Sequence, residues 1–228
     1  MEENIIERID VSPENFHKHV WVPHRPVIKT EPNSTTKICP VLNCSLKTDN
    51  KPSLNEAAYA GVNLMNDLTK LALYFRSNKY VVLSDIKQAF LQIQLANDAD
   101  KNRFSFFMKK NDDLVAYRYR TIIFGFNASP FILNYIIKYH AEKFPDDECS
   151  RILRNNFYVD NLIVTGNSED ELKGLYKESN LRMSEGGFEL RSRHGTLNSE
   201  SLRSEFISND NMFSITIIRK TFLDIITL

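Results

Sequence analysis

The sequence predicts an α+β protein built on an antiparallel sheet of the split βαβ type, with helices on one face. Residues 79–86 form a continuous apolar run that closes on Asp85, the pattern of a strand buried on both faces. Two hairpins are predicted at residues 104–123 and 157–163, where Asn and Asp stand between apolar flanks. Helical patterns separate these strands, so the middle of the chain alternates between the two structures.

Helix starts are marked by a serine followed three residues later by a glutamate, the spacing of a capping box. This pattern occurs at residues 53–56, and the helix that it opens is predicted to end near residues 77–78. It occurs again at residues 168–171, opening a helix predicted to end at the glycine pair 186–187. A third helix, over residues 131–144, is predicted because a capping serine and then a first-turn proline precede it.

Composition restricts the class of protein. The 228 residues are 42% hydrophobic and 25% charged, which suffices for one large or two small domains with a buried core. No apolar run approaches the roughly 18 residues of a membrane span, and the first residues are acidic where a signal peptide would be basic. We therefore expect no membrane association and an intracellular location.

Charge and cysteine content exclude further classes. The net charge is zero, with 29 basic and 29 acidic residues, which argues against nucleic-acid binding through a general positive field. Basic residues do crowd the window 101–120, which is either a local nucleic-acid patch or the solvated face of a hairpin. The 3 cysteines have no metal-ligand spacing with the 5 histidines, so neither a disulfide framework nor a zinc site is expected.

Two aspartates of the predicted sheet are candidates for one site. Asp85 ends a strand, and Asp160 stands at the tip of a hairpin beside Asn161. If their strands are neighbours, the two carboxylates meet and can hold magnesium, a hard cation that takes few protein oxygens and leaves room for water and phosphate. An aspartate in a tight turn is more often structural than catalytic, so a structural role for Asp160 stays open on this pattern alone.

Three segments, in this order and at this spacing, carry a resemblance to a known family. They are residues 85–90 (DIKQAF), 124–130 (FGFNASP) and 157–161 (FYVDN). Together they resemble the palm motifs of reverse transcriptases. The rival interpretation, an unrelated α+β interaction domain, does not account for three ordered motifs.

Upstream segments make the resemblance more specific. Residues 23–29 (PHRPVIK), 41–45 (VLNCS) and 52–55 (PSLN) are similar to the reverse transcriptase of a Bel/Pao-type long-terminal-repeat retrotransposon. The resemblance covers about residues 20–195 and implies polymerase fingers and palm. The implied divisions are an N-terminal extension over residues 1–19, fingers over 20–80 and 101–123, palm over 81–100 and 124–195, and a truncated or aberrant tail toward a thumb over 196–228.

The resemblance implies an RNA-directed DNA polymerase that transfers nucleotides from a dNTP to a primer 3′-hydroxyl with two Mg²⁺, or Mn²⁺, ions. It assigns catalytic roles to Asp85, Asp160 and Asn161. The metal ligands would be the carboxylates of Asp85 and Asp160 together with the backbone carbonyl of Ile86.

The resemblance also implies a nucleotide site. Phe90 would lie under the sugar and exclude a 2′-hydroxyl, although a core aromatic is the alternative. Phe124 and Gly125 would pack against the incoming nucleotide and the template, with glycine permitting close backbone approach. Lys29 would reach the triphosphate, and Lys37 is a weaker candidate for the same role.

Partners follow from the same resemblance. Tyr158 and Val159 would lie beside the primer terminus. An RNA or DNA template with its primer would be held through phosphates and A-form shape rather than by base reading. The RNase H and integrase domains of such polyproteins are expected to be absent from this chain, and the expected location is the cytoplasm or retroelement particles.

Three departures from the family pattern leave a second function open, that of a catalytically inactive retroelement remnant that at most binds nucleic acid. Asn161 stands where the family usually has a second aspartate, which removes a negative charge. Cys39 stands where an arginine usually contacts the triphosphate. Ser192 stands where a lysine usually donates a proton, and its neighbour Arg191 is a poor acid because it never deprotonates.

Overall fold

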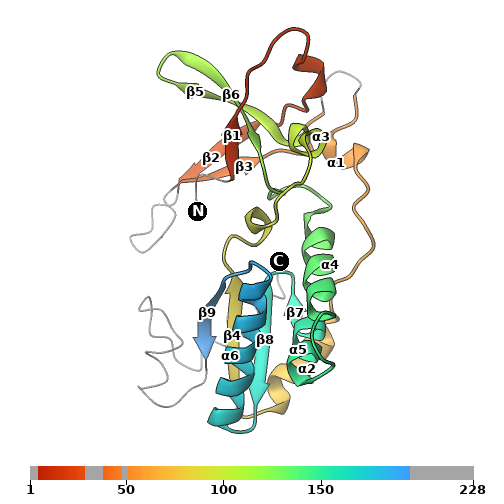
Figure 1. Ribbon diagram of the computed structural model, residues 1–228, viewed down its shortest axis with the longest axis vertical. Helices are drawn as coiled ribbons and strands as arrows, with labels where there is room; N and C mark the ends of the chain where they lie inside the picture. The colour runs from red at the N-terminus through yellow and green to blue at the C-terminus, as the bar shows by residue number, and fades with distance from the viewer. Residues whose placement is uncertain (1–4, 29–37, 48–50, 196–228) are drawn as a thin grey trace. The chain divides into compact units, whose positions relative to one another are not determined.

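The computed structural model describes residues 5–28, 38–47 and 51–195. Two compact units make up the chain, which passes from one to the other after Val62, Ala89 and Ile132 (Figure 1). The first unit therefore includes residues up to Val62 together with Phe90–Ile132. The second unit includes Asn63–Ala89 and the chain from Leu133 onward.

The first unit contains two antiparallel sheets. A three-stranded sheet has the order β1-β6-β5, and β2 pairs with β3 in a hairpin of its own. The bounds are Ile6–Arg8 for β1, His24–Ile28 for β2, Ile38–Leu42 for β3, Ser105–Lys110 for β5 and Asp113–Tyr119 for β6. The hairpin predicted over residues 104–123 is thus confirmed as β5 and β6, with Asn111 at φ 57° in its turn.

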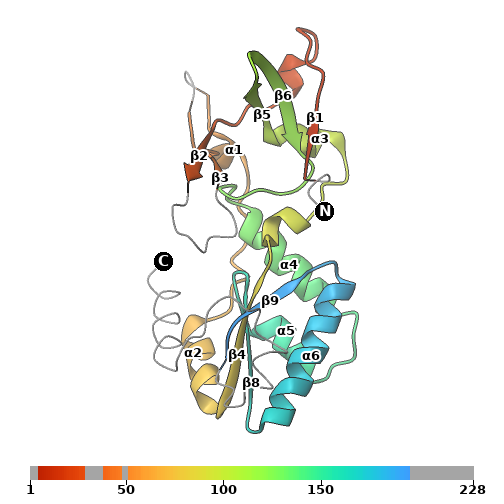
Figure 2. The same cartoon turned by 90° about the vertical axis from the view of Figure 1, so that its left-hand side faces the viewer.

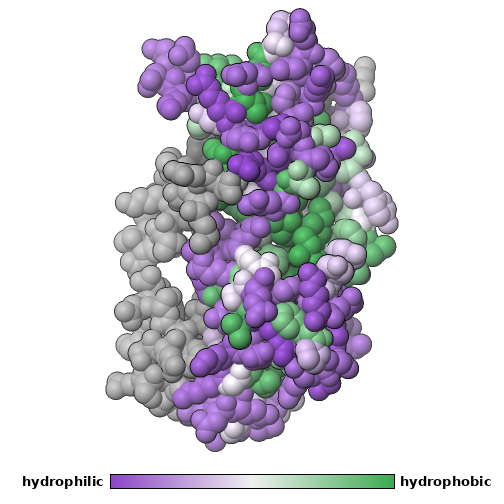
Figure 3. All heavy atoms as spheres, viewed as in Figure 1, coloured by the Kyte–Doolittle hydropathy of each residue, from purple (hydrophilic) through white to green (hydrophobic). Residues whose placement is uncertain are grey.

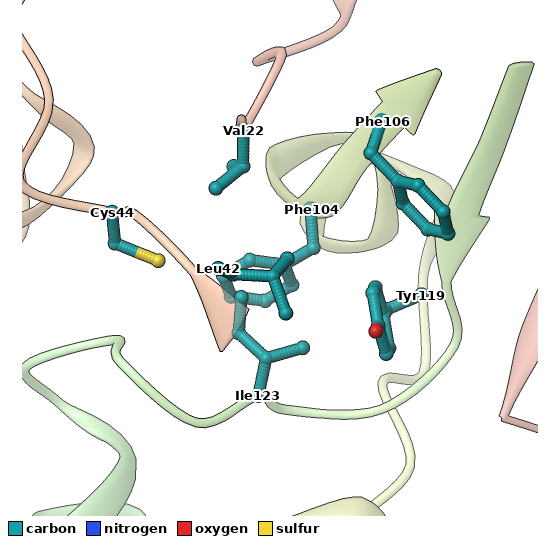
Figure 4. Packing of buried hydrophobic residues seen from close by; sticks show 7 residues of the cluster. All are labelled: Val22, Leu42, Cys44, Phe104, Phe106, Tyr119 and Ile123. Carbon is teal, nitrogen blue, oxygen red and sulfur yellow. The ribbon is translucent and has the colours of Figure 1, made fainter. Parts of the chain in front are cut away.

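The core of the first unit combines aromatic and aliphatic side chains (Figure 4). Phe104, Phe106 and Tyr119 pack with Leu42 of β3 and with Ile123, which is fully buried. The ring centroids of Phe106 and Tyr119 lie 5.3 Å apart. Apolar burial of this kind fixes the pairing register of β5 and β6, because a slip of one residue would expose the buried face.

Ion pairs account for most of the basic window 101–120. Arg118 contacts Glu7 at 2.6 Å and Asp98 at 3.0 Å. Carboxylates also lie within ion-pair distance of Lys101, Arg103, Lys109 and Arg120. These contacts favour the solvated hairpin face over a nucleic-acid patch.

The second unit is built on an antiparallel sheet of order β7-β8-β4-β9. The bounds are Tyr80–Ile86 for β4, Phe157–Tyr158 for β7, Asn161–Gly166 for β8 and Leu190–Gly195 for β9. Every residue of β4 from Val81 to Ile86 is buried, as expected of a strand covered on both faces. The sequence left open whether this strand and the second hairpin are neighbours, and the structure shows that they are, since β4 pairs directly with β8.

Helices cover both faces of this sheet (Figure 2). On one face, α2 (Leu68–Ser77) packs Leu71 against Leu83 and Ile163. On the other face lie α5 (Glu148–Asn155) and α6 (Glu169–Glu185). The α+β class is confirmed, and the prediction of helices on one face is corrected, because alternate side chains of β4 are apolar on both faces and each face requires cover.

The outer surface of α6 is mostly hydrophilic (Figure 3), whereas its inner face buries Leu172, Tyr176, Ser179 and Met183 at helical spacing. The predicted capping box forms at its start, and the helix ends at the glycine pair 186–187, as predicted. No helix in the described part of the chain is both long and apolar enough to cross a membrane.

The helix predicted over residues 53–78 is wrong in its middle. The capping box at Ser53 forms, but α1 ends after a single turn, at Leu54–Ala57. The chain is then non-helical until Asp67, whose side chain accepts two backbone N–H hydrogen bonds and starts α2. Gly61, at φ 85°, lies in this break, and α2 ends at Ser77 as predicted.

The helix after residue 128 is confirmed as α4 (Ser129–Ala141), but its predicted cap is wrong. The Ser129 hydroxyl donates to the Ile123 carbonyl at 2.7 Å instead. This buried bond fixes the turn that connects β6 to α4.

Candidate active site

Asp85 lies in the central strand of the second sheet, between two strands that each place a polar side chain opposite it. In this sheet β4 lies between β8 and β9 (Figure 1). On β8 the partner of Asp85 is Asn161, and on β9 its partner is Arg191. Directly opposite residues of an antiparallel pair point to the same face, so the three side chains share one face of the sheet. Asp85 is only 4% exposed. Its carboxylate Oδ2 accepts a hydrogen bond from Nη2 of Arg191 at 2.8 Å.

Asp160 is positioned by the turn between β7 and β8. Tyr158 pairs with Asn161, so the two turn residues are Val159 and Asp160. This corrects the expectation that Asp160 and Asn161 together form the turn, because Asn161 is already the first residue of β8. The turn is tied to the end of β4 by the Ile86 N–H, which donates to the Asp160 carbonyl at 2.9 Å.

The backbone of Val159 is strained. Its φ is 55°, in the left-handed region, where a β-branched side chain is rare and costs about 1–3 kcal/mol. The cost is compatible with the fold because the β7–β8 pairing and the Ile86 hydrogen bond fix the turn on both sides. The same contacts fix the backbone of the neighbouring Asp160.

The side chains at the hairpin tip interact with each other. Nδ2 of Asn161 donates to Oδ1 of Asp160 at 3.0 Å. An aspartate at position 161 cannot make this bond when ionised, because an ionised carboxylate only accepts. Asn161 therefore provides a hydrogen-bond donor for the Asp160 carboxylate. It also leaves the site with two carboxylates rather than three.

The donor set fits magnesium. Within the described residues, no group of three or more His, Cys, Asp or Glu side chains is placed to hold a metal ion. Magnesium does not need such a cage, since it is commonly held by one or two carboxylates and completes its octahedron with water and substrate phosphates. Asp85, Asp160 and the amide oxygen of Asn161 supply hard oxygen donors of that kind.

The segment around Gly125 is fixed by the first unit itself. Gly125 has φ 88°, and a Cβ there would lie 2.8 Å from the Leu42 carbonyl oxygen. Nδ2 of Asn55 donates to the Gly125 carbonyl at 3.0 Å, and Oδ1 of Asn55 accepts from the Asn127 N–H at 2.9 Å. Sequence reasoning missed this positioning role of Asn55, although its segment was among those that carry the resemblance.

Sequence comparison decides the family. The family model for "Reverse transcriptase (RNA-dependent DNA polymerase)" matches residues 34–193, which is most of the chain. The chain belongs to the reverse transcriptase family. A comparison with curated proteins found no match.

Among solved structures, this reverse transcriptase domain is similar to the prototype foamy virus protease–reverse transcriptase, a CSH mutant labelled with selenomethionine. The TM-score is 0.59 at 14% sequence identity, and the match covers 83% of this chain and 21% of that one. The chain thus spans about one fifth of the viral protein, and a likeness at this identity shows the fold alone. The predicted polymerase fold is confirmed.

The remaining predicted site residues of this reverse transcriptase domain lie in several places. Phe90 is 8% exposed, and its ring meets that of Phe124 edge-on at 4.8 Å, both within the first unit. Burial against Phe124 agrees with the core-aromatic alternative, and the sugar-gate role stays a prediction. Lys29 and Lys37 lie outside the described residues.

The positions that depart from the family pattern are in regular strands. Cys39 pairs with Val27 in the β2–β3 hairpin, and Ser192 pairs with Ser84 between β9 and β4. Sequence reasoning treated Arg191 only as a poor acid and missed its ion pair with Asp85. The contact became visible only in the structure, where the register of β9 against β4 places Arg191 opposite Asp85.

Proposed function

We propose that this domain catalyses RNA-directed DNA synthesis, adding nucleotides from dNTPs to a primer 3′-hydroxyl on an RNA or DNA template. The observation that carries the proposal is the pairing of Asp85 with Asn161, which brings Asp160 to the same end of the sheet. The family match supports the reaction class, and the Bel/Pao-type motifs support an origin in a retrotransposon polyprotein.

The proposed metal ligands are Asp85, Asp160 and the carbonyl of Ile86. Bound Mg²⁺ or Mn²⁺ would activate the primer hydroxyl and neutralise charge on the pyrophosphate leaving group. The chain itself would preorganise these ligands before the metal ions bind. Asp85 is buried in the central strand, and the hydrogen bond from Ile86 to the Asp160 carbonyl fixes the tip of the hairpin against that strand.

The proposed nucleotide and primer contacts follow the family motifs. Phe90, Phe124 and Gly125 would face the incoming nucleotide, with Lys29 at its triphosphate. Tyr158 and Val159, which flank Asp160 in the hairpin, would face the primer terminus. In this proposal the fingers and palm have the bounds that the resemblance implies.

Two features of the site favour a second function, that of an inactive remnant that binds nucleic acid. Asn161 replaces a metal-binding carboxylate, and Arg191 already neutralises Asp85. Both contacts suit a chain that has lost catalysis and binds template and primer without extending them.

Primer extension on an RNA template separates these functions. The polymerase proposal predicts extension with dNTPs in Mg²⁺ and faster extension in Mn²⁺, which tolerates a weaker ligand set. If binding to the template–primer is measurable and neither metal supports extension, the inactive-remnant function is the correct one.

A further inference from the structure

Two arginines in the second unit make different use of their donors. Arg182 is 7% exposed and donates through Nε to Glu178 and through both Nη atoms to Asp147, with Ser150 as a further partner. All three of its guanidinium nitrogens donate, as in an arginine that holds α5 against α6.

Arg191 has a much sparser set of contacts. Among the described residues, its side chain donates one hydrogen bond, from Nη2 to Asp85, and its buried Nε has no partner there. A bidentate fork, the strong form of an arginine–carboxylate pair, is not made. A side chain held by one contact and 41% exposed can leave its carboxylate without breaking a network.

Asp85 needs a positive partner whether or not a metal is bound. A carboxylate this deeply buried is costly in its charged form unless it is paired. A divalent ion at Asp85 would also supply that charge, but it would then stand next to the guanidinium, and like charges at such a distance repel strongly in a partly buried site. Arg191 and a metal ion therefore compete for the negative charge of Asp85.

We propose that Arg191 is the counter-ion of Asp85 in the metal-free domain and is displaced from Oδ2 when a divalent cation binds. Arg191 is then a positioning residue that orients the carboxylate, and it sets the affinity of the metal site. This inference rests on the proposed function, because it requires Asp85 to be a metal ligand.

A neighbouring ion pair provides the matched control. Nζ of Lys87 contacts the Glu189 carboxylate at 2.9 Å, also between the β4 and β9 segments and two residues from the Asp85–Arg191 pair. If the arginine served only to hold these segments together, loss of either pair would have the same effect. Competition with a metal ion is expected of Arg191 and not of Lys87.

The test is the Mn²⁺ affinity of the nucleotide-free chain, measured by electron paramagnetic resonance. Arg191→Gln is expected to lower the Kd about tenfold, because a repelling charge is removed. Lys87→Gln is expected to leave the Kd unchanged, and Arg191→Lys, which keeps the charge, is expected to stay within about threefold of the natural chain. An unchanged or higher Kd in Arg191→Gln would overturn the inference.

A second measurement needs no variant. In the natural chain, titration with Mg²⁺ is expected to shift the ¹⁵Nε signal of Arg191 and to leave that of Arg182 in place. If Mn²⁺ binds saturably but the Arg191 signal does not shift, the displacement of Arg191 is contradicted and the metal site of the proposed function is not. If neither the natural chain nor Arg191→Gln binds Mn²⁺ saturably, the metal site of the proposed function is wrong.

Discussion

The side-chain amide of Asn161 donates to the carboxylate of Asp160 at 3.0 Å, at the tip of the hairpin that carries the proposed metal ligand. Asn161→Asp replaces this hydrogen bond with repulsion between two carboxylates and adds a charge opposite Asp85. We expect the metal-free variant to lose about 1 kcal/mol of unfolding free energy, recovered when Mg²⁺ is added. Thermal melts with and without Mg²⁺ measure both effects.

In primer extension, Asn161→Asp is expected to raise the rate, because a second ligand charge strengthens metal binding. An equal or lower rate would show that the asparagine suits the site as it stands. If the melting temperature of Asn161→Asp does not change with Mg²⁺, repulsion between carboxylates is not the cause of its lower stability.

Phe90→Ala tests the sugar-gate role against the core role. Removing a buried ring that packs on Phe124 is expected to cost about 3–5 kcal/mol of stability in either case. The gate role further predicts that ribonucleotides are incorporated. Phe104→Ala is the matched control, since Phe104 is a buried ring of the same unit with no proposed substrate contact. A ratio of ribonucleotide to deoxynucleotide incorporation that is unchanged in Phe90→Ala leaves only the core role.

Gly125→Ala should be among the most damaging single methyl additions in the first unit. The new Cβ would lie 2.8 Å from the Leu42 carbonyl oxygen at a φ of 88°. We expect a loss of about 1–3 kcal/mol in urea unfolding.

The control for this change is Gly174→Ala. Gly174 is helical, and its Cβ would meet nothing within 4 Å, so alanine is expected to stabilise α6 by about 0.5–1 kcal/mol. Similar stabilities for the two variants would contradict the close approach at Gly125.

Acid stability should depend on Asp147. The hydrogen bond from Arg182 holds the pKa of the Asp147 carboxyl well below its usual range. A carboxylate whose pKa is depressed on folding stabilises the fold above its unfolded pKa of about 4, and this contribution is lost as the pH falls through the folded pKa. Asp147→Asn is therefore expected to cost about 1–2 kcal/mol near pH 7, discounted for the exposure of the carboxylate.

Urea unfolding of the natural chain and Asp147→Asn from pH 7 to pH 2 measures this dependence. The difference between the two is expected to be constant down to about pH 4 and to shrink below it. A difference that is independent of pH would exclude the ion pair with Arg182 as its source.

The sequence predicted the parts of the fold that depend on local pattern. The apolar run before Asp85, the second hairpin and the capping boxes at Ser53 and Ser168 all occur as expected. The break between α1 and α2 was not predicted, because the periodic apolar residues continue through it while Gly61 and the cap at Asp67 interrupt the helix.

The site itself was only partly predictable. The sequence proposed Asp85 and Asp160 as one site on the condition that their strands are neighbours, whereas the partner of Asp85 on β9 depended on register. β4 and β9 lie far apart in the sequence, so no turn length fixes their register and no count along the sequence places Arg191 opposite Asp85. The left-handed backbone of Val159 also has no local signal, because a β-branched residue rarely adopts it.

The most direct test of the proposed polymerase site is primer extension by Asp160→Ala beside Asp170→Ala, an exposed acid on the outer face of α6. Both changes remove one carboxylate, and only the first removes a proposed metal ligand. The site predicts that extension is abolished in Asp160→Ala, by at least about a thousandfold, and is retained in Asp170→Ala. Extension that survives in Asp160→Ala at a rate near that of the natural chain would contradict it.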